Sequence, residues 1–245
     1  MFLRFILSLC FGIVFFGCAD IERDNPNDPK SPNYIADAYL FSSSSVFSAP
    51  LSSSGGGACP DAVTTDNSVS CGGQTYETVK IGLQTWMKSN LNYAVSGSKC
   101  GNGSSLSDTN TTTCDTYGRL YNWEISKTVC PSGWHLPSDA EWTALINYVE
   151  SRGNCTGCAG TRLKAKSGLW YENTGTDNHG FSALPGGYGS SVGNFNYVGS
   201  YGYWWSSTEY NSNFAHSRDM YYYFSNVDRG ISSKTYLFSV RCMQN

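Results

Sequence analysis

Cysteines constrain this chain of 245 residues more than any other residue type, because the sequence contains ten of them. Two lie within or directly after an apolar N-terminal run, at Cys10 and Cys18. An even number of cysteines in an exported chain favours disulfides, and eight cysteines allow roughly a hundred pairings. We therefore expect four disulfides among the remaining eight, which are Cys59, Cys71, Cys100, Cys114, Cys130, Cys155, Cys158 and Cys242.

Loop closure suggests one set of pairs, although the spacing leaves the alternatives open. One bond closes the entrance of the domain, a second closes a polar loop, and a third ties the segment before a predicted helix to the last predicted strand. The remaining C-x-x-C follows that helix and has no second pair at zinc-site spacing, so a structural disulfide is favoured over a redox or zinc site. This set is Cys59–Cys71, Cys100–Cys114, Cys130–Cys242 and Cys155–Cys158.

The N-terminus has the pattern of a lipoprotein export signal. A short basic segment, 1–4, precedes an apolar run, 5–16, that is too short to span a bilayer comfortably. Gly17 and Cys18 then resemble a lipobox, with Phe15 where Leu is usual. We expect residues 1–18 to be a signal peptide with Cys18 as the lipidated residue. An ordinary signal peptide with incidental cysteines is the alternative.

Composition divides the rest of the chain in two. Residues 19–58 are rich in Asp, Asn, Pro, Ser and Gly, which predicts a flexible tether that holds the domain away from the membrane. Residues 59–245 are long enough for one globular domain with a real core. The chain is 15% aromatic and only 14% charged, with a net charge of −3 and no Lys/Arg cluster, so nucleic acid is excluded as a partner.

The clearest predicted element is a helix that follows Ser138. Ser138 and Glu141 have the spacing of a capping box, and Gly153 is a suitable stop. Apolar residues recur between them at helical spacing, at Trp142, Leu145, Ile146 and Val149.

Short alternating runs predict strands on both sides of this helix. The polar stretch 96–116 is expected to be a loop. The expected strands are residues 74–81, 84–87, 203–207, 220–224 and 237–242.

Several motifs occur in a fixed order between residues 72 and 243 and carry a family resemblance. They are Thr85-Trp86-Met87, Tyr117-Gly-Arg-Leu-Tyr-Asn-Trp123, Cys130-Pro-Ser-Gly-Trp-His-Leu-Pro-Ser-Asp-Ala-Glu-Trp142, Gly180-Phe-Ser-Ala-Leu-Pro-Gly-Gly-Tyr188, Tyr203-Trp-Trp-Ser-Ser-Thr-Glu209 and Ser239-Val-Arg-Cys242. Together they resemble the Fibrobacter succinogenes major paralogous domain (FISUMP). Members of that family are typically exported or lipid-anchored proteins of unknown biochemical role.

A more distant likeness implies a fold. The segment that starts at Cys130 and ends in Glu-Trp on a helix is similar to the first helix region of C-type lectin-like domains and of formylglycine-generating enzymes. In C-type lectin-like domains a cysteine near this helix pairs with one in the final strand, and Cys130 and Cys242 are placed for that pairing. The likeness implies an α+β, C-type lectin-like fold with small twisted antiparallel sheets, one or two helices, long loops and disulfides.

No pattern in the sequence predicts catalysis, a cofactor or a metal. The lectin calcium motifs are missing, and no Cys lies between Cys158 and Cys242 where the copper site of formylglycine-generating enzymes would be. His135 belongs to a motif that we interpret as structural, and no histidine pair has zinc spacing. Asp139 and Glu141 point to different faces of a helix, and the latter has a capping role. Asp177 and Asn178 suit a metal, but a turn is the simpler interpretation.

Aromatic residues give the best indication of binding, because flat amphipathic rings stack on sugars and proteins at low entropic cost. On a strand Trp204 and Trp205 must face opposite sides, so at most one is expected at the surface. Tyr203, Trp204, Trp205 and Tyr222 are the candidate ligand-binding residues. They belong to a crowded set that also contains Tyr197, Tyr201, Tyr210, Tyr221 and Tyr223.

The sequence therefore predicts an exported lipoprotein of the outer membrane or cell surface, attached to the membrane by its anchor. Its domain is expected to be a binding module for polysaccharide or for another surface component, and not an enzyme. The alternatives are a diverged enzyme of the formylglycine-generating type and a purely structural envelope lipoprotein. A groove lined by the late aromatic residues would favour the first interpretation.

Overall fold

A computed structural model describes residues 59, 61–108, 111–172 and 174–245. The predicted signal peptide, the lipidation site Cys18 and the predicted tether 19–58 lie outside the described residues. In the part that is described, none of the helices is both long and apolar enough to cross a bilayer.

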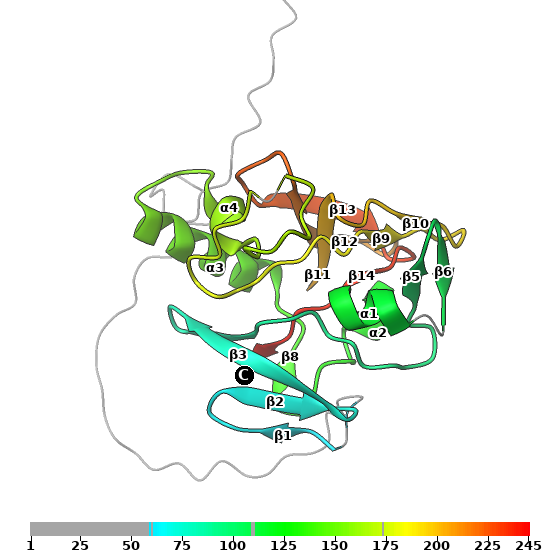
Figure 1. The fold of residues 1–245 in the computed structure, drawn as a ribbon. Helices are drawn as coiled ribbons and strands as arrows, with labels where there is room; N and C mark the ends of the chain where they lie inside the picture. Colours follow the sequence, from blue (N-terminus) through cyan, green and yellow to red (C-terminus); the bar gives the residue numbers. More distant parts are fainter. Residues whose placement is uncertain (1–58, 60, 109–110, 173) are drawn as a thin grey trace, which may run out of the picture. The chain divides into compact units, whose positions relative to one another are not determined.

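The first sheet has six strands and joins the two ends of the described domain. The segments predicted at 74–81 and 84–87 form a hairpin in it, with Trp86 opposite Val79. The last strand of the chain lies between that hairpin and a strand from the middle of the sequence (Figure 1). The order is β1 (Val63–Thr64), β2 (Ser68–Cys71), β3 (Gln74–Ile81), β4 (Gln84–Met87), β15 (Met243–Gln244) and β8 (Trp134–His135).

The second sheet has five strands, and its long strands come from the aromatic part of the sequence. Its only parallel neighbours, among the strands that the structure describes, are β11 and β14. The order is β13 (Asp228–Ser233), β12 (Phe214–Tyr221), β11 (Tyr201–Glu209), β14 (Phe238–Ser239) and β7 (Leu120–Tyr121). Two small hairpins complete the strands: β5 (Cys100–Asn102) with β6 (Ser105–Ser107), and β9 (Tyr188–Gly189) with β10 (Phe195–Asn196).

The long helix α3 (Asp139–Gly153) begins with a complete capping box. The Ser138 hydroxyl accepts from the backbone N–H of Glu141, and the Glu141 carboxylate accepts from the backbone N–H of Ser138. The helix includes Gly153, and the left-handed residue that ends it is Asn154, with φ 48°. Three short helices lie elsewhere in the described residues: α1 (Thr111–Tyr117), α2 (Trp123–Ser126) and α4 (Ala159–Leu163).

The molecule therefore has small, mostly antiparallel sheets with few helices, which places it in the α+β class. Three sequence expectations about strands and loops were wrong in detail, one of them the strand at 237–242, of which only Phe238–Ser239 is a strand. The stretch 96–116 contains the β5–β6 hairpin and most of α1. The strand expected at 220–224 lies mainly before that position, because β12 ends at Tyr221 and a turn follows.

The core is built around tryptophans on the two faces of β11. Trp204 lies on the α3 side, in a cluster of rings with Trp142, Trp86 and Phe181. Its neighbour Trp205 points to the opposite face of the sheet and is equally buried. Both faces of β11 are therefore covered in this part of the strand.

Cysteine pairs connect segments that are distant in the sequence. The pair Cys130–Cys242 joins the segment before α3 to the last strands over a separation of 112 residues. The other three pairs close short loops, of which one contains the C-x-x-C between α3 and α4. The four pairs are Cys59–Cys71, Cys100–Cys114, Cys130–Cys242 and Cys155–Cys158.

A buried arginine connects the last strands to the rest of the core. Arg241 is fully buried, and its guanidinium donates to the carbonyls of Met87 and Phe181 and to the side-chain oxygen of Asn90. The same oxygen accepts from the indole of Trp204 at 2.8 Å. Burial lowers the pKa of Arg241 to about 9. The Ser-Val-Arg-Cys motif thus has a structural role.

Candidate functional site

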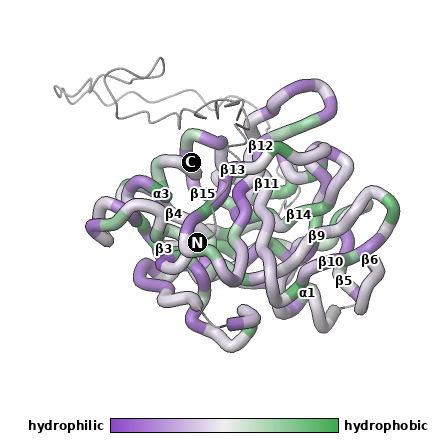
Figure 2. Tube along the Cα trace, turned by 90° about the horizontal axis from the view of Figure 1, so that it is seen from above, coloured by the Kyte–Doolittle hydropathy of each residue, from purple (hydrophilic) through white to green (hydrophobic). Residues whose placement is uncertain are grey.

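Aromatic side chains line a cleft of about 430 Å³ beside the five-stranded sheet. The residues come from β9, from the turn after β10, and from β11 to β14, which Figure 2 shows on one side of the domain. This volume is in the range of small-molecule sites, from about 300 to 1,000 Å³. The lining residues are Tyr188, Tyr197, Tyr201, Tyr203, Tyr221, Tyr223, Ser232, Tyr236 and Phe238.

The alternation of β-strand side chains brings these rings together. Tyr201 and Tyr203 are two residues apart on β11 and therefore share a face. Tyr221 lies directly opposite Tyr201 on β12, and their ring centroids are 4.7 Å apart. Tyr223 follows Tyr221 by two residues and stacks on it at 6.0 Å. A plain strand pattern thus produces one wall of the cleft.

The opposite wall comes from the β9–β10 hairpin. Tyr197 has a left-handed backbone, with φ 61°, which is uncommon for a residue other than glycine. In this conformation its ring stacks on Tyr201 at 4.6 Å and on Tyr188 at 6.0 Å. Strained backbone of this kind persists where the surroundings fix it, and here it sets the position of a ring at the rim.

A stack of rings forms a rigid base for the cleft. Phe238 from β14 lies between Tyr203 and Trp205, at 5.0 Å and 4.4 Å from their ring centroids, with both pairs nearly parallel. The indole of Trp205 also donates to the carbonyl of Tyr121 at 2.8 Å. The base is therefore part of the core, whereas Tyr197 and Tyr223 at the rim are about half exposed, at 53% and 49%.

A buried lysine fixes the turn that carries the outer rings. The Lys164 ammonium donates to the carbonyls of Tyr221 at 2.5 Å and of Phe224 at 2.6 Å, and lies 5.1 Å from the ring centroid of Trp170. Burial lowers the pKa of Lys164 to about 8. The ammonium supplies donors to two carbonyls of the 221–224 turn, of which that of Tyr221 also accepts from the backbone N–H of Phe224, and it links this turn to the end of α4.

Beneath the cleft lies a buried carboxyl group. Asp219 is directly opposite Tyr203 in the β11–β12 register, and only 7% of it is exposed. Its carboxylate accepts from the Ser217 hydroxyl at 2.9 Å. Burial, with the negative charge of Asp228, raises the pKa of Asp219 to about 7. The pKa values of Tyr203 and Tyr221 are raised too, chiefly by burial and partly by this carboxyl group.

A model of a known sequence family matches the segment of the chain that contains this cleft. The model of the Fibrobacter succinogenes major domain matches residues 79–244, which include every residue that lines the cleft. The chain belongs to this family. No curated protein and no solved structure matches it.

Within this Fibrobacter succinogenes major domain, the four candidate ligand residues separate. Tyr203 lines the cleft. Trp204 and Trp205 are fully buried, so neither indole is available at the surface. Tyr222 points away from the cleft, and its ring packs 5.1 Å from that of Tyr171. The sequence pattern did not separate them because both faces of β11 are covered at this point.

Sequence reasoning also missed several lining residues of the family domain. Tyr188, Tyr236 and Phe238 come from segments outside the crowded aromatic set, and only the folding of the sheet brings them to the cleft. A local signal existed for the wall on β11 and β12, where tyrosines recur at i and i+2, at positions 201 and 203 and at positions 221 and 223.

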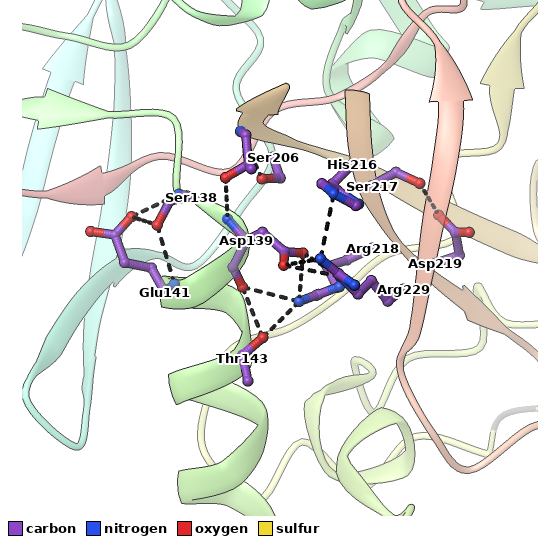
Figure 3. A network of polar contacts seen from close by, with 11 residues as sticks. Ser138, Asp139, Glu141, Thr143, Ser206, His216, Ser217, Arg218, Asp219 and Arg229 are labelled. Atoms are coloured by element: carbon purple, nitrogen blue, oxygen red, sulfur yellow. Dashed lines mark hydrogen bonds and ion pairs between the residues drawn. The ribbon is translucent and has the colours of Figure 1, made fainter. Parts of the chain in front are cut away.

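A second polar cluster of the family domain, around Asp139, is structural (Figure 3). The Asp139 carboxylate lies 2.8 Å from the guanidinium of Arg218 and 2.8 Å from that of Arg229. Glu141, on another face of the helix, contacts the Nε2 atom of His135 at 3.1 Å. The two carboxylates thus have separate partners and do not form an acid–base pair.

The Asp177 loop is also held by internal contacts. The two oxygens of the Asp177 carboxylate accept from the backbone N–H and the hydroxyl of Ser182, at 2.8 Å and 2.7 Å. The carboxylate thus closes a turn. Across the part of the chain that the structure describes, no group of three or more His, Cys, Asp or Glu side chains is arranged to hold a metal ion.

Proposed function

We propose that this protein is a surface-displayed binding module whose tyrosine-lined cleft holds a sugar unit of a polysaccharide. The observation that carries the proposal is the cleft itself, with seven tyrosines and Phe238 around one opening. Tyrosine rings present a flat apolar face and a hydroxyl, so they stack on the C–H face of a sugar and hydrogen bond to its hydroxyl groups. The proposed role is binding, not catalysis.

Preorganisation supports the proposal. The base of the cleft is packed into the core through Phe238 and Trp205, and the outer turn is fixed by Lys164. A ligand therefore loses little affinity to the ordering of side chains, except at the exposed rings of Tyr197 and Tyr223.

The expected display of the domain completes the proposal. The N-terminal pattern that ends at Cys18 is that of a lipoprotein signal, and residues 19–58 have the composition of a tether. We propose an anchor in the outer membrane or at the cell surface. We also propose a C-type lectin-like arrangement, supported by the bond from Cys130, before the long helix, to Cys242 near the last strand.

A binding experiment tests the function. The full chain with Cys18→Ser, which has no acylation site, is incubated with insoluble cellulose and with a panel of soluble polysaccharides. We expect Tyr197→Ala to weaken binding about tenfold, because loss of a stacked ring at a binding site costs about 1–3 kcal/mol. Tyr171→Ala is the matched control, since Tyr171 is 74% exposed and lies outside the cleft. Absence of binding to every polysaccharide would overturn the proposal.

A further inference from the structure

Among the described residues, no cation contacts the carboxyl group of Asp219 on its own face of the sheet, and the positive charge of Arg218 acts on it only through space. Its hydrogen bond comes from a neutral hydroxyl, that of Ser217. Buried carboxylates are usually paired with a cation, and those that are not paired are common at functional sites. Asp219 does not itself line the cleft, but it shares a face of the sheet with Tyr203 and Tyr221, which do, so its charge lies close to whatever the cleft holds.

The groups that face Asp219 are neutral or acidic on every neighbouring strand. From β11 Tyr203 faces it, and from β12 Ser217 and Tyr221 lie two residues away on the same face. From β13 Asp228 lies directly opposite, and its negative charge acts on Asp219. The side chain of Arg218 points to the opposite face, where it pairs with Asp139 (Figure 3).

A chain of hydroxyl groups connects Asp219 to the cleft. The Ser217 hydroxyl donates to the carboxylate and lies 3.4 Å from the hydroxyl of Ser232, which lines the cleft. On the other side the hydroxyl groups of Tyr203 and Tyr221 hydrogen bond to each other. A positive group on a ligand would thus act on the carboxyl group through polar groups of the cleft floor.

The tyrosine rings of the cleft also favour a positively charged ligand. Ring faces of tyrosine carry partial negative charge and attract cations. Among the described residues that line the cleft none is Lys, Arg or His. The local field therefore favours a positive ligand and opposes a negative one, and the low polarity of the buried surroundings strengthens the effect.

We propose that the cleft selects sugars that carry a protonated amine over neutral sugars, and neutral sugars over uronic acids, through the charge of Asp219. This selectivity rests on the proposed function, because it assumes that the cleft binds a sugar ring. Stacking on the tyrosines contributes equally to the affinity for all three kinds of sugar. The charge of the sugar substituent determines how the three affinities differ.

Three soluble probes with the same ring size and linkage test the selectivity: β-1,4-linked trimers of glucosamine, of glucose and of glucuronic acid. Their affinities for the full chain with Cys18→Ser are measured by titration calorimetry at low salt and at a fixed pH of 7, where a carboxyl group with a pKa of about 7 is about half ionised. We expect the glucosamine trimer to bind about tenfold more tightly than the glucose trimer, and the glucuronic acid trimer to bind about tenfold more weakly.

Asp219→Asn on the same chain removes the charge and keeps the shape and an acceptor for Ser217. In this variant we expect the three affinities to fall within about twofold of one another, with the glucose trimer unchanged. Asp66→Asn is the matched control for net charge, since Asp66 is exposed in the turn between β1 and β2. This control is expected to keep the full preference. Near-UV circular dichroism confirms that both variants are folded.

The outcomes separate the two proposals. If the three trimers bind the parent chain equally, or if the preference survives in Asp219→Asn, sugar binding stands and the selectivity is overturned. If none of the trimers binds but a polysaccharide of the panel does, the selectivity is overturned and sugar binding stands; if no polysaccharide binds either, both proposals are overturned.

Discussion

Arg218 and Asp219 are sequence neighbours on β12 with opposite charge and similar burial, yet their surroundings differ. Arg218 is 2% exposed and pairs with Asp139 at the start of α3. Asp219 is 7% exposed and receives its hydrogen bond from Ser217 alone among the contacts resolved for it. Arg218 thus has a carboxylate in direct contact, whereas Asp219 has a neutral hydrogen-bond donor and is affected by the charge of Arg218 only through space.

The comparison distinguishes a buried charge with an ionic partner inside the domain from a buried charge without a direct one. The arginine is enclosed by contacts within the domain, because its guanidinium also donates to the hydroxyl of Thr143 at 2.8 Å. The aspartate lies on the face of the sheet that carries the cleft. When its carboxyl group is ionised, its burial destabilises the folded state.

The largest expected effect is on the compensated side. Asp139→Ala leaves the Arg218 guanidinium buried without its carboxylate, and loss of one partner of a buried pair costs about 3–5 kcal/mol. We expect the free energy of unfolding, measured by urea titration at pH 7, to fall by about 4 kcal/mol. Glu172→Ala, at an exposed acidic residue, is the control. A loss below about 1 kcal/mol would break the comparison, because Arg218 would then need no partner.

The ionised carboxyl group of Asp219 is expected to destabilise the folded protein, and the dependence of stability on pH tests this. Its pKa is raised from 3.8 to about 7 in the folded protein, so between these values the folded state binds more protons than the unfolded state. Its contribution to stability is therefore present at low pH and is lost as pH rises towards 7. We expect Asp219→Asn to be more stable than the parent chain at pH 8, by about 3 kcal/mol.

The measurement is a urea titration of both chains between pH 4 and pH 8. The gap should be almost closed at pH 4, because this pH lies next to the ordinary pKa of 3.8 and little of the interval up to the raised pKa remains below it. A gap that stays constant over this range would show that Asp219 does not titrate between the two values.

The smallest effects come from the hydroxyl groups on the two faces. Thr143→Val removes an acceptor of the Arg218 guanidinium, and Ser217→Ala removes the donor to Asp219. Each is expected to cost about 1 kcal/mol, as is usual for one buried hydrogen bond. They differ in pH dependence: Ser217→Ala should raise the pKa of Asp219 further, whereas Thr143→Val should leave it unchanged. Carboxyl NMR titration of Asp219 in both variants tests this difference.

Local patterns in the sequence predicted the elements that local interactions determine. The hairpin at 74–87 and the start of the helix after Ser138 follow from alternation and from a capping box, and the structure confirms both. The helix end was displaced by one residue, since Asn154 and not Gly153 takes the left-handed conformation. The β5–β6 hairpin was missed because its strands have three residues each and carry no periodic signal.

The candidate site depended on tertiary structure, so the sequence predicted it only in part. Tyr203 was identified, but Trp204 and Trp205 are in the core because α3 covers one side of β11 and Phe238 covers the other. No local sequence pattern pointed to Asp219. Only the folded structure shows that Arg218 contacts a carboxylate on α3, whereas no cation contacts Asp219 among the described residues.

The insertion of β15 between β4 and β8 affects the order in which the domain forms. Trp86 and His135 both pair with Met243, so two parts of the first sheet stay apart until the last strand arrives. Pairing across such a distance in the sequence is slow, because the loop must close before its contacts form. Until residues 243–244 pair with them, these edges of β4 and β8 have no partner strand, and unpaired edges of this kind favour aggregation during folding.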